Sequence, residues 1–236
     1  MVVLMDTGTD LLLLAIDPDS GQTRFGPRLS YALPVAELTD LVQAGRLGLD
    51  ENNLVVINAK PTGQAQADSA LTVLAEHPEP LSVGSWVKWR GPRRIDPYLH
   101  DAVDAGIVHI VTAGSPERTV ISVDDAERIR SATRKLIAVL DEPEASFADT
   151  AFAVLAGTAG LTGPHLHGWD RRRHRARLSA LDHAGPGEVA TSVLRAGAEA
   201  ARRLAKRAGL DPRTIDQQIG LTPAARTAAI FLGGHL

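Results

Sequence analysis

The sequence predicts a mainly α-helical protein, a helical bundle with two small β-hairpins. Apolar residues recur at helical spacing in several segments, and glycine directly follows some of them, as it often follows the end of a helix. Two pairs of short segments, several rich in β-branched residues, flank turn-forming residues, which is typical of hairpins. Beyond Asp124 the apolar spacing is helical throughout, so helices are expected to dominate the fold.

The first two elements are predicted to be helices. Residues 10–16 form a short apolar run that the turn-forming residues 17–21 end, so this helix is expected to be buried on all sides. Pro34 is predicted to occupy the first turn of the next helix, where proline is tolerated. Apolar residues then recur at helical spacing up to Gly45, which makes this segment an amphipathic helix.

A unit of helix, glycine and hairpin occurs twice in the first half. Gly45 precedes the first predicted hairpin and Gly106 precedes the second, and the residues around the two glycines are similar enough to indicate a weak internal repeat. The predicted elements of these units are strands over residues 46–49 and 54–57, a helix over 95–105, and strands over 107–111 and 118–123.

The second half is predicted to be a helical bundle that packs on the first half. We expect a single domain over residues 1–236, with a helix and hairpin half over 1–123 and a bundle half over 124–236. The helices predicted in the bundle half cover residues 125–140, 147–159, 169–183, 188–208 and 223–232.

Composition excludes several classes of protein. The chain has no cysteine, which rules out disulfides, thiolate zinc sites and cysteine nucleophiles. Its formal net charge is −3, so a phosphate-bearing partner would need a local basic patch. The longest apolar stretch, residues 11–16, is far short of a membrane span, and no leader sequence is recognisable. We therefore expect a cytoplasmic protein, peripheral at most on the inner face of the membrane.

Several motifs occur in a set order, and each would be weak alone. They cover residues 10–17, 27–33, 41–47, 61–63, 68–71, 85–87 and 99–108. Together they resemble the family of Golgi phosphoprotein 3, whose bacterial relatives carry the same marks, and the resemblance is clearest over residues 11–123. It implies a mainly helical fold with small hairpins, no known catalytic chemistry, and an adaptor that reads phosphatidylinositol-4-phosphate on a membrane.

The resemblance also implies a site for the lipid headgroup. The aromatic residue of the family falls on or beside Phe25, and the family's first arginine is replaced by Pro34, although Arg28 lies earlier in the same segment. The family's arginine pair aligns near Pro92 and Ile95, next to three arginines that are out of register. The residues predicted to bind an anionic phospholipid headgroup are therefore Phe25, Arg28, Arg90, Arg93 and Arg94.

Other readings of the sequence stay open. Trp86 is expected to pack in the core, whereas Trp89 can pack or lie at a headgroup rim. The basic run 171–177 is expected to be a solvated face, and His165 with His167 is expected to be a loop rather than a metal site. No motif of an enzyme or cofactor site occurs in its required context. The alternatives to lipid binding are a winged-helix regulator that binds nucleic acid, and a scaffold that binds a protein partner or its own copy.

Overall fold

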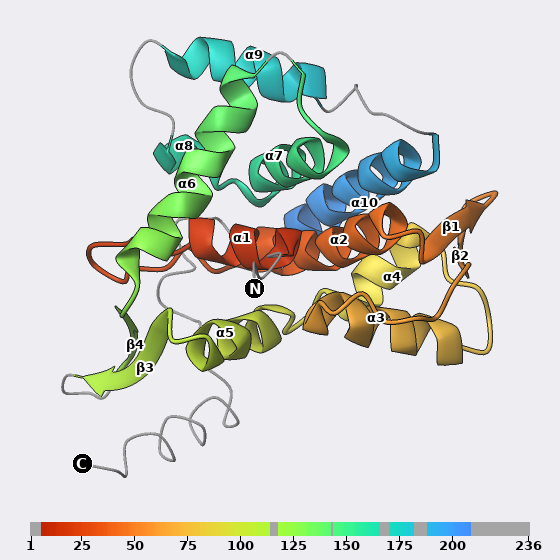
Figure 1. Cartoon of the computed structure of the whole chain (residues 1–236), viewed down its shortest axis with the longest axis horizontal. Coiled ribbons are helices and arrows are strands. Elements are labelled where there is room, and N and C mark those ends of the chain that lie inside the picture. The colour runs from red at the N-terminus through yellow and green to blue at the C-terminus, as the bar shows by residue number, and fades with distance from the viewer. Residues whose placement is uncertain (1–5, 114–117, 143, 166–169, 182–187, 209–236) are drawn as a thin grey trace.

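The computed structural model describes residues 6–113, 118–142, 144–165, 170–181 and 188–208 (Figure 1). In these residues the chain forms ten helices and two antiparallel hairpins, which confirms the predicted fold class. The elements are α1 (Thr7–Leu14), α2 (Pro27–Gln43), β1 (Leu47–Asp50), β2 (Asn53–Val56), α3 (Ala65–Glu76), α4 (Val83–Arg90), α5 (Ile95–Asp104), β3 (Val108–Ala113), β4 (Arg118–Val123), α6 (Ala126–Asp141), α7 (Phe147–Ala159), α8 (Thr162–His165), α9 (Asp170–Leu181) and α10 (Glu188–Arg207).

Helix α2 lies at the centre of the fold and packs against α1, α7 and α10 (Figure 1). The apolar run of the first helix is fully buried, as expected, because Leu11 to Leu14 are all 0% exposed. Helices from both halves of the sequence contribute to the same hydrophobic cluster. The bundle half therefore packs on the first half, while the division into domains stays a prediction.

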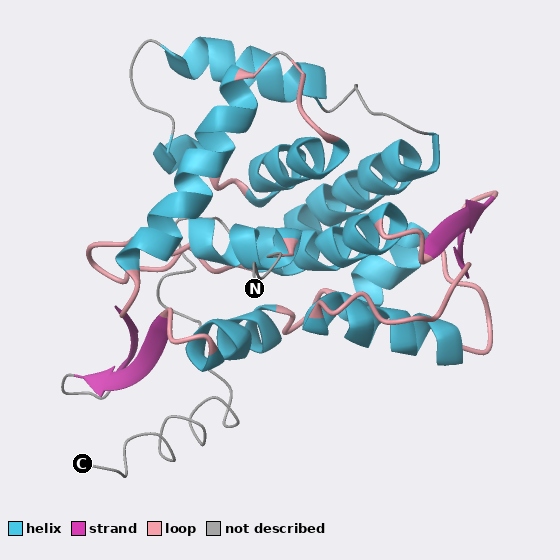
Figure 2. Cartoon of the chain, in the orientation of Figure 1, coloured by secondary structure: helices cyan, strands magenta, loops and turns pink. Residues whose placement is uncertain are grey.

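The two hairpins form separate two-stranded sheets at opposite ends of the view in Figure 2. In the first sheet Leu47 pairs with Val56 and Asp50 pairs with Asn53, and in the second Val108 pairs with Val123. Both hairpins were predicted, and both begin directly after a helix.

The two helix ends that precede the hairpins have the same backbone geometry. Gly45 and Gly106 each have φ of +67°, the left-handed conformation that glycine adopts readily. The amide of Arg46 donates to the Leu41 carbonyl at 2.8 Å, and the amide of Ile107 donates to the Ala102 carbonyl at 3.0 Å. This six-residue bond is the Schellman cap of a helix. The similar sequences at the two junctions thus encode the same turn.

Pro34 does not begin a helix, contrary to the prediction. Helix α2 begins at Pro27, so Pro34 lies in its interior, where a proline removes one backbone hydrogen bond and costs about 3 kcal/mol. Leu33, Val35 and Leu38 are all 0% exposed, and their burial offsets this cost.

No helix was predicted from local spacing for the residues that form α3, α4 and α8. The helices expected over residues 125–140, 147–159, 169–183 and 188–208 are confirmed within a few residues as α6, α7, α9 and α10. The helix expected over residues 223–232 lies outside the described residues.

Candidate functional site

The candidate site is built on the α4–α5 junction, residues 91–94, which helix α2 holds in place. Helix α4 begins at the Ser82 cap, whose hydroxyl accepts a hydrogen bond from the Ser85 amide at 3.2 Å. At the other end of α4, the Ser30 hydroxyl donates to the Gly91 carbonyl. A Cβ at Gly91 would lie 2.2 Å from the ring of Tyr31, so only glycine lets α2 approach this closely.

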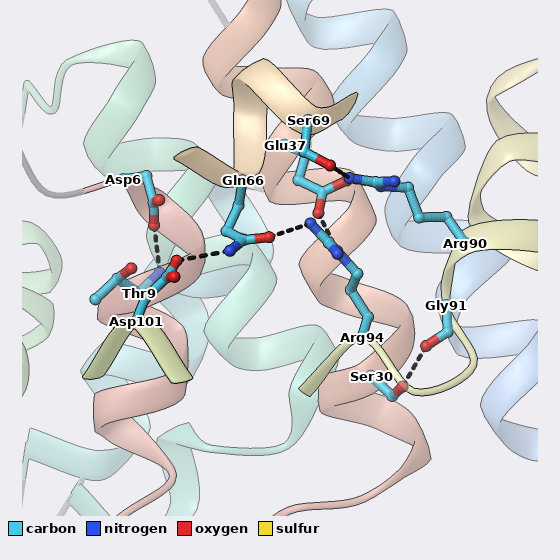
Figure 3. A network of polar contacts seen from close by, with 10 residues as sticks. All are labelled: Asp6, Thr9, Ser30, Glu37, Gln66, Ser69, Arg90, Gly91, Arg94 and Asp101. Carbon is cyan, nitrogen blue, oxygen red and sulfur yellow. Dashed lines mark hydrogen bonds and ion pairs between the residues drawn. The ribbon is translucent and has the colours of Figure 1, made fainter. Parts of the chain in front are cut away.

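A buried ion cluster lies beneath this junction. Arg90 Nε lies 2.5 Å from one carboxylate oxygen of Glu37, and Arg94 Nε donates to the other. Figure 3 shows the two guanidinium groups converging on this carboxylate. The side chains of Glu37, Arg90 and Arg94 are 0%, 8% and 9% exposed. Burial raises the pKa of Glu37, and the two arginines act against that rise.

Further polar groups extend this cluster into α3 and α5 (Figure 3). Arg94 donates to Gln66 at 2.5 Å, and the Gln66 amide donates to Asp101 at 2.7 Å. The Arg90 guanidinium also lies 4.9 Å from the ring centre of Trp86. We call these residues the Glu37 hub: Glu37, Gln66, Arg90, Arg94 and Asp101. Because each charge in the hub has a partner, the hub ties four helices together.

Three exposed side chains, Lys88 and Trp89 at the end of α4 and Arg93 in the α4–α5 junction, are neighbours of the hub residues Arg90 and Arg94 in the sequence. Trp86 is 0% exposed, as expected, but Trp89 is 59% exposed although the two ring centres are only 5.6 Å apart. Lys88 and Arg93 are exposed as well, and neither makes a hydrogen bond or ion pair with the described part of the chain. We call Lys88, Trp89 and Arg93 the Trp89 cluster. It offers two cations beside an exposed aromatic ring.

Arg93 has an unusual backbone conformation. Its φ is +61°, in the left-handed region where a residue with a Cβ is strained by roughly 1–2 kcal/mol. Strain of this kind is often found at functional positions. The structure therefore presents the Arg93 side chain from a backbone that glycine would fit better.

The structure separates the five residues predicted to bind a headgroup. Phe25 is buried at 3% exposure. Arg90 and Arg94 are bound in the Glu37 hub, whereas Arg93 is exposed. Arg28 is exposed too, and its guanidinium lies beside Gly160 at the end of α7 rather than at the α4–α5 junction. The structure thus brings Arg90, Arg93 and Arg94 to one junction and places Phe25 and Arg28 elsewhere.

Glu37, the centre of the hub, was not predicted as a site residue from the sequence. Its partners lie 53 and 57 residues away, so no local spacing connects them. One signal was present: Glu37 is an isolated acid between the apolar residues Val35, Ala36 and Leu38. A carboxylate among apolar neighbours in a helix is buried only with a partner.

The histidines near residue 165 and the basic run of α9 make contacts within the fold. His165 Nε2 donates to the Leu14 carbonyl at 3.0 Å, while His167 lies outside the described residues. No group of metal-ligating side chains suited to an ion occurs in the part of the chain that the structure describes. In the basic run of α9, Arg173 and His174 both contact Asp141 at the end of α6.

The fold and the site define a class of mainly helical proteins with two separate hairpins and a buried ion cluster under one helical junction. The family model of Golgi phosphoprotein 3 (GPP34) matches residues 8–217. The chain therefore belongs to the Golgi phosphoprotein 3 family, as its motifs indicated. A search of curated proteins finds no match. Among the described residues no helix has both the length and the apolar character needed to span a bilayer.

Proposed function

We propose that this protein is a non-enzymatic, cytoplasmic adaptor that binds an anionic phospholipid headgroup, through the Trp89 cluster, at the inner face of a membrane. The observation that carries the proposal is the exposed ring of Trp89 at the end of a helix that also carries the exposed Lys88 and is followed by the exposed Arg93, neither of which pairs with a residue that the structure describes. Membership of the Golgi phosphoprotein 3 family supports an adaptor of this kind, and phosphatidylinositol-4-phosphate is the first headgroup to test.

The chemistry of the cluster suits a membrane surface. Tryptophan favours the depth of the lipid headgroups, because its ring is apolar and its N–H is polar. Each lysine or arginine close to an anionic membrane contributes about 1 kcal/mol. Arginine also offers several donors to one phosphate group, which lysine cannot match in geometry. Trp89 would thus insert its ring at the depth of the headgroups, and Lys88 would attract the anionic surface. Arg93 would contact the phosphate directly.

The five predicted headgroup residues have different roles under this proposal. Arg93 contacts the headgroup, whereas Arg28 is exposed beside the end of α7 and is not part of the Trp89 cluster. Arg90 and Arg94 hold the junction from beneath through Glu37, and Phe25 belongs to the core. Removing Arg90 or Arg94 would therefore disturb folding as well as binding, so these two residues are unsuitable for a binding test.

Flotation with lipid vesicles tests the proposal. The wild-type protein should float with vesicles that contain phosphatidylinositol-4-phosphate or another anionic phospholipid, and not with neutral vesicles. The variant Lys88→Ala/Arg93→Ala should lose most of this flotation. The control Arg24→Ala/Lys60→Ala removes two exposed cations elsewhere and should float like the wild type. Equal behaviour of the two variants would contradict a site at the junction.

The same preparations separate the other candidate functions. Binding of DNA with a steep dependence on salt, and no flotation, would indicate a regulator that binds nucleic acid. Self-association by light scattering, with neither response, would indicate a scaffold that binds its own copy or a protein partner. Either result would replace the lipid proposal.

A further inference from the structure

A groove at the opposite end of helix α4 from the Trp89 cluster is lined by both basic and acidic side chains. Its volume is about 690 Å³, and helix α10, the β1–β2 turn and the first turn of α4 form its walls. This volume lies within the range of roughly 300–1,000 Å³ that small-molecule sites occupy. The groove is thus large enough for a small ligand.

Arg195 and Glu51 supply an unpaired cation and an unpaired anion to this groove. Arg195 projects from α10 and Glu51 from the β1–β2 turn, and both side chains are exposed. Neither forms a hydrogen bond or an ion pair with any residue that the structure describes. The groove therefore offers a guanidinium and a carboxylate from different elements.

The backbone at Glu51 supports a role for its carboxylate. Its φ is +54°, a left-handed value at a tight hairpin turn where glycine, asparagine or aspartate is preferred. A glutamate in this position bears local strain. The strained residue is thus the one that supplies the carboxylate to the groove.

The remaining lining residues indicate what kind of ligand the groove can hold. Leu49 of β1 and Val83 of α4 are apolar and also line the groove. Arg203 and Glu199 also line it but face each other at 3.6 Å, and such an exposed pair contributes little. The lining thus has no net charge, which disfavours a simple anion.

We infer that this groove binds a zwitterionic phosphoester, a molecule with a phosphate at one end and an ammonium group at the other. Arg195 donates hydrogen bonds to the phosphate, Glu51 accepts them from the ammonium group, and the short carbon chain between lies on Leu49 and Val83. Phosphoethanolamine has this chemistry, either as a soluble compound or as the headgroup of a phospholipid. The inference does not rest on the Trp89 cluster.

Titration of the full chain with O-phosphoethanolamine, followed by the amide NMR signals of Gly84 and Ser192 in the groove, tests the inference. The wild type should show saturable shifts at both amides. Arg195→Ala should weaken binding of both O-phosphoethanolamine and inorganic phosphate by about tenfold, since it removes charge-assisted hydrogen bonds. Glu51→Gln should weaken the binding of O-phosphoethanolamine by a similar factor and leave the binding of inorganic phosphate unchanged.

Matched variants exclude diffuse electrostatic effects. Arg207→Ala removes an exposed cation from the same helix, and Glu76→Gln removes an exposed carboxylate from α3. Both should bind like the wild type, as should Lys88→Ala/Arg93→Ala, whose failure in flotation concerns the other site. The inference is overturned if Arg207→Ala weakens binding as much as Arg195→Ala, if Glu51→Gln has no effect, or if neither groove amide shifts.

Vesicles identify the source of the ligand. If the ligand is a lipid, phosphatidylethanolamine in phosphatidylcholine vesicles should shift the same two amides, and Glu51→Gln should abolish the shift. If the soluble compound alone shifts them, the ligand is a free phosphoester. Both results support the groove as a zwitterion site.

Discussion

Arg90 Nε lies 2.5 Å from the carboxylate of Glu37, and Arg94 occupies the other oxygen of the same group. One buried carboxylate therefore pairs with two arginines, Arg90 at the end of α4 and Arg94 just before α5. Salt bridges of this kind are costly to form, because every charge must leave water, but removing one partner is costlier still. This asymmetry makes Glu37 the residue on which the junction depends.

Glu37→Ala should destabilise the protein by about 3–5 kcal/mol, because two buried guanidinium groups would lose their counter-charge. Urea unfolding measures the loss. Glu37→Gln keeps the shape and an acceptor and should lose less. A variant Glu37→Ala as stable as the wild type would show that the hub does not hold the junction.

Arg93→Gly should separate stability from binding. The left-handed backbone at this position costs an arginine about 1–2 kcal/mol, and glycine removes that cost while losing about 0.5–1 kcal/mol to chain entropy. Thermal unfolding should therefore occur at the same or a higher temperature. Flotation with anionic vesicles should decrease. A variant that unfolds earlier and floats normally would contradict both expectations.

Gly21 and Gly45 offer a matched test of close packing. Their φ angles are +68° and +67°, so alanine suffers the same strain of roughly 1–2 kcal/mol at both positions. A Cβ at Gly21 would lie 2.1 Å from the Ile121 carbonyl, whereas one at Gly45 meets nothing within 4 Å. Gly21→Ala should thus be clearly the less stable variant in urea unfolding, and equal losses would contradict the close approach.

Stability should fall as the pH rises from about 4 to 7, partly because of Asp40. Burial raises the pKa of Asp40 from 3.8 to about 7, so the folded state keeps a proton that the unfolded state loses in this range. Below pH 4 both states are protonated, and above pH 7 both are ionised, so the change is confined to that window. Burial also raises the pKa of Asp6, which acts in the same direction.

Asp40→Asn tests this assignment. The wild-type carboxylate accepts hydrogen bonds from the Thr7 amide at 3.0 Å and the Thr7 hydroxyl at 2.6 Å, and asparagine keeps one acceptor for them. Urea unfolding should be measured at pH 5 and at pH 8. The free energy of unfolding should fall less between these two pH values in the variant than in the wild type. The same loss in both proteins would assign the pH dependence to other groups.

Local patterns explain what the sequence could predict about the fold. The hairpins and the helix ends at Gly45 and Gly106 were predictable because turn residues and apolar spacing act over a few neighbours. Pro34 was misplaced because tertiary burial of α2 outweighs the local cost of an interior proline. Helix α3 was missed; the residue before it makes no side-chain capping bond that would mark its start.

The candidate site was less predictable, because it depends on distant contacts. The sequence placed three arginines near one junction, but which of them face inward is decided by Glu37, more than 50 residues away. The exposure of Trp89, next to the buried Trp86, follows from the rotation of α4 against the core, which its eight residues alone do not specify.

The central claim is that the Trp89 cluster meets the membrane, and quenching of tryptophan fluorescence by brominated lipids tests it most directly. Anionic vesicles with brominated acyl chains should quench the wild type strongly. In a Trp169→Phe background, Trp89→Phe should lose most of this quenching, because the one remaining tryptophan, Trp86, is fully buried. If the wild type floats with the vesicles but Trp89→Phe is quenched to the same extent, another surface contacts the membrane and the claim is wrong.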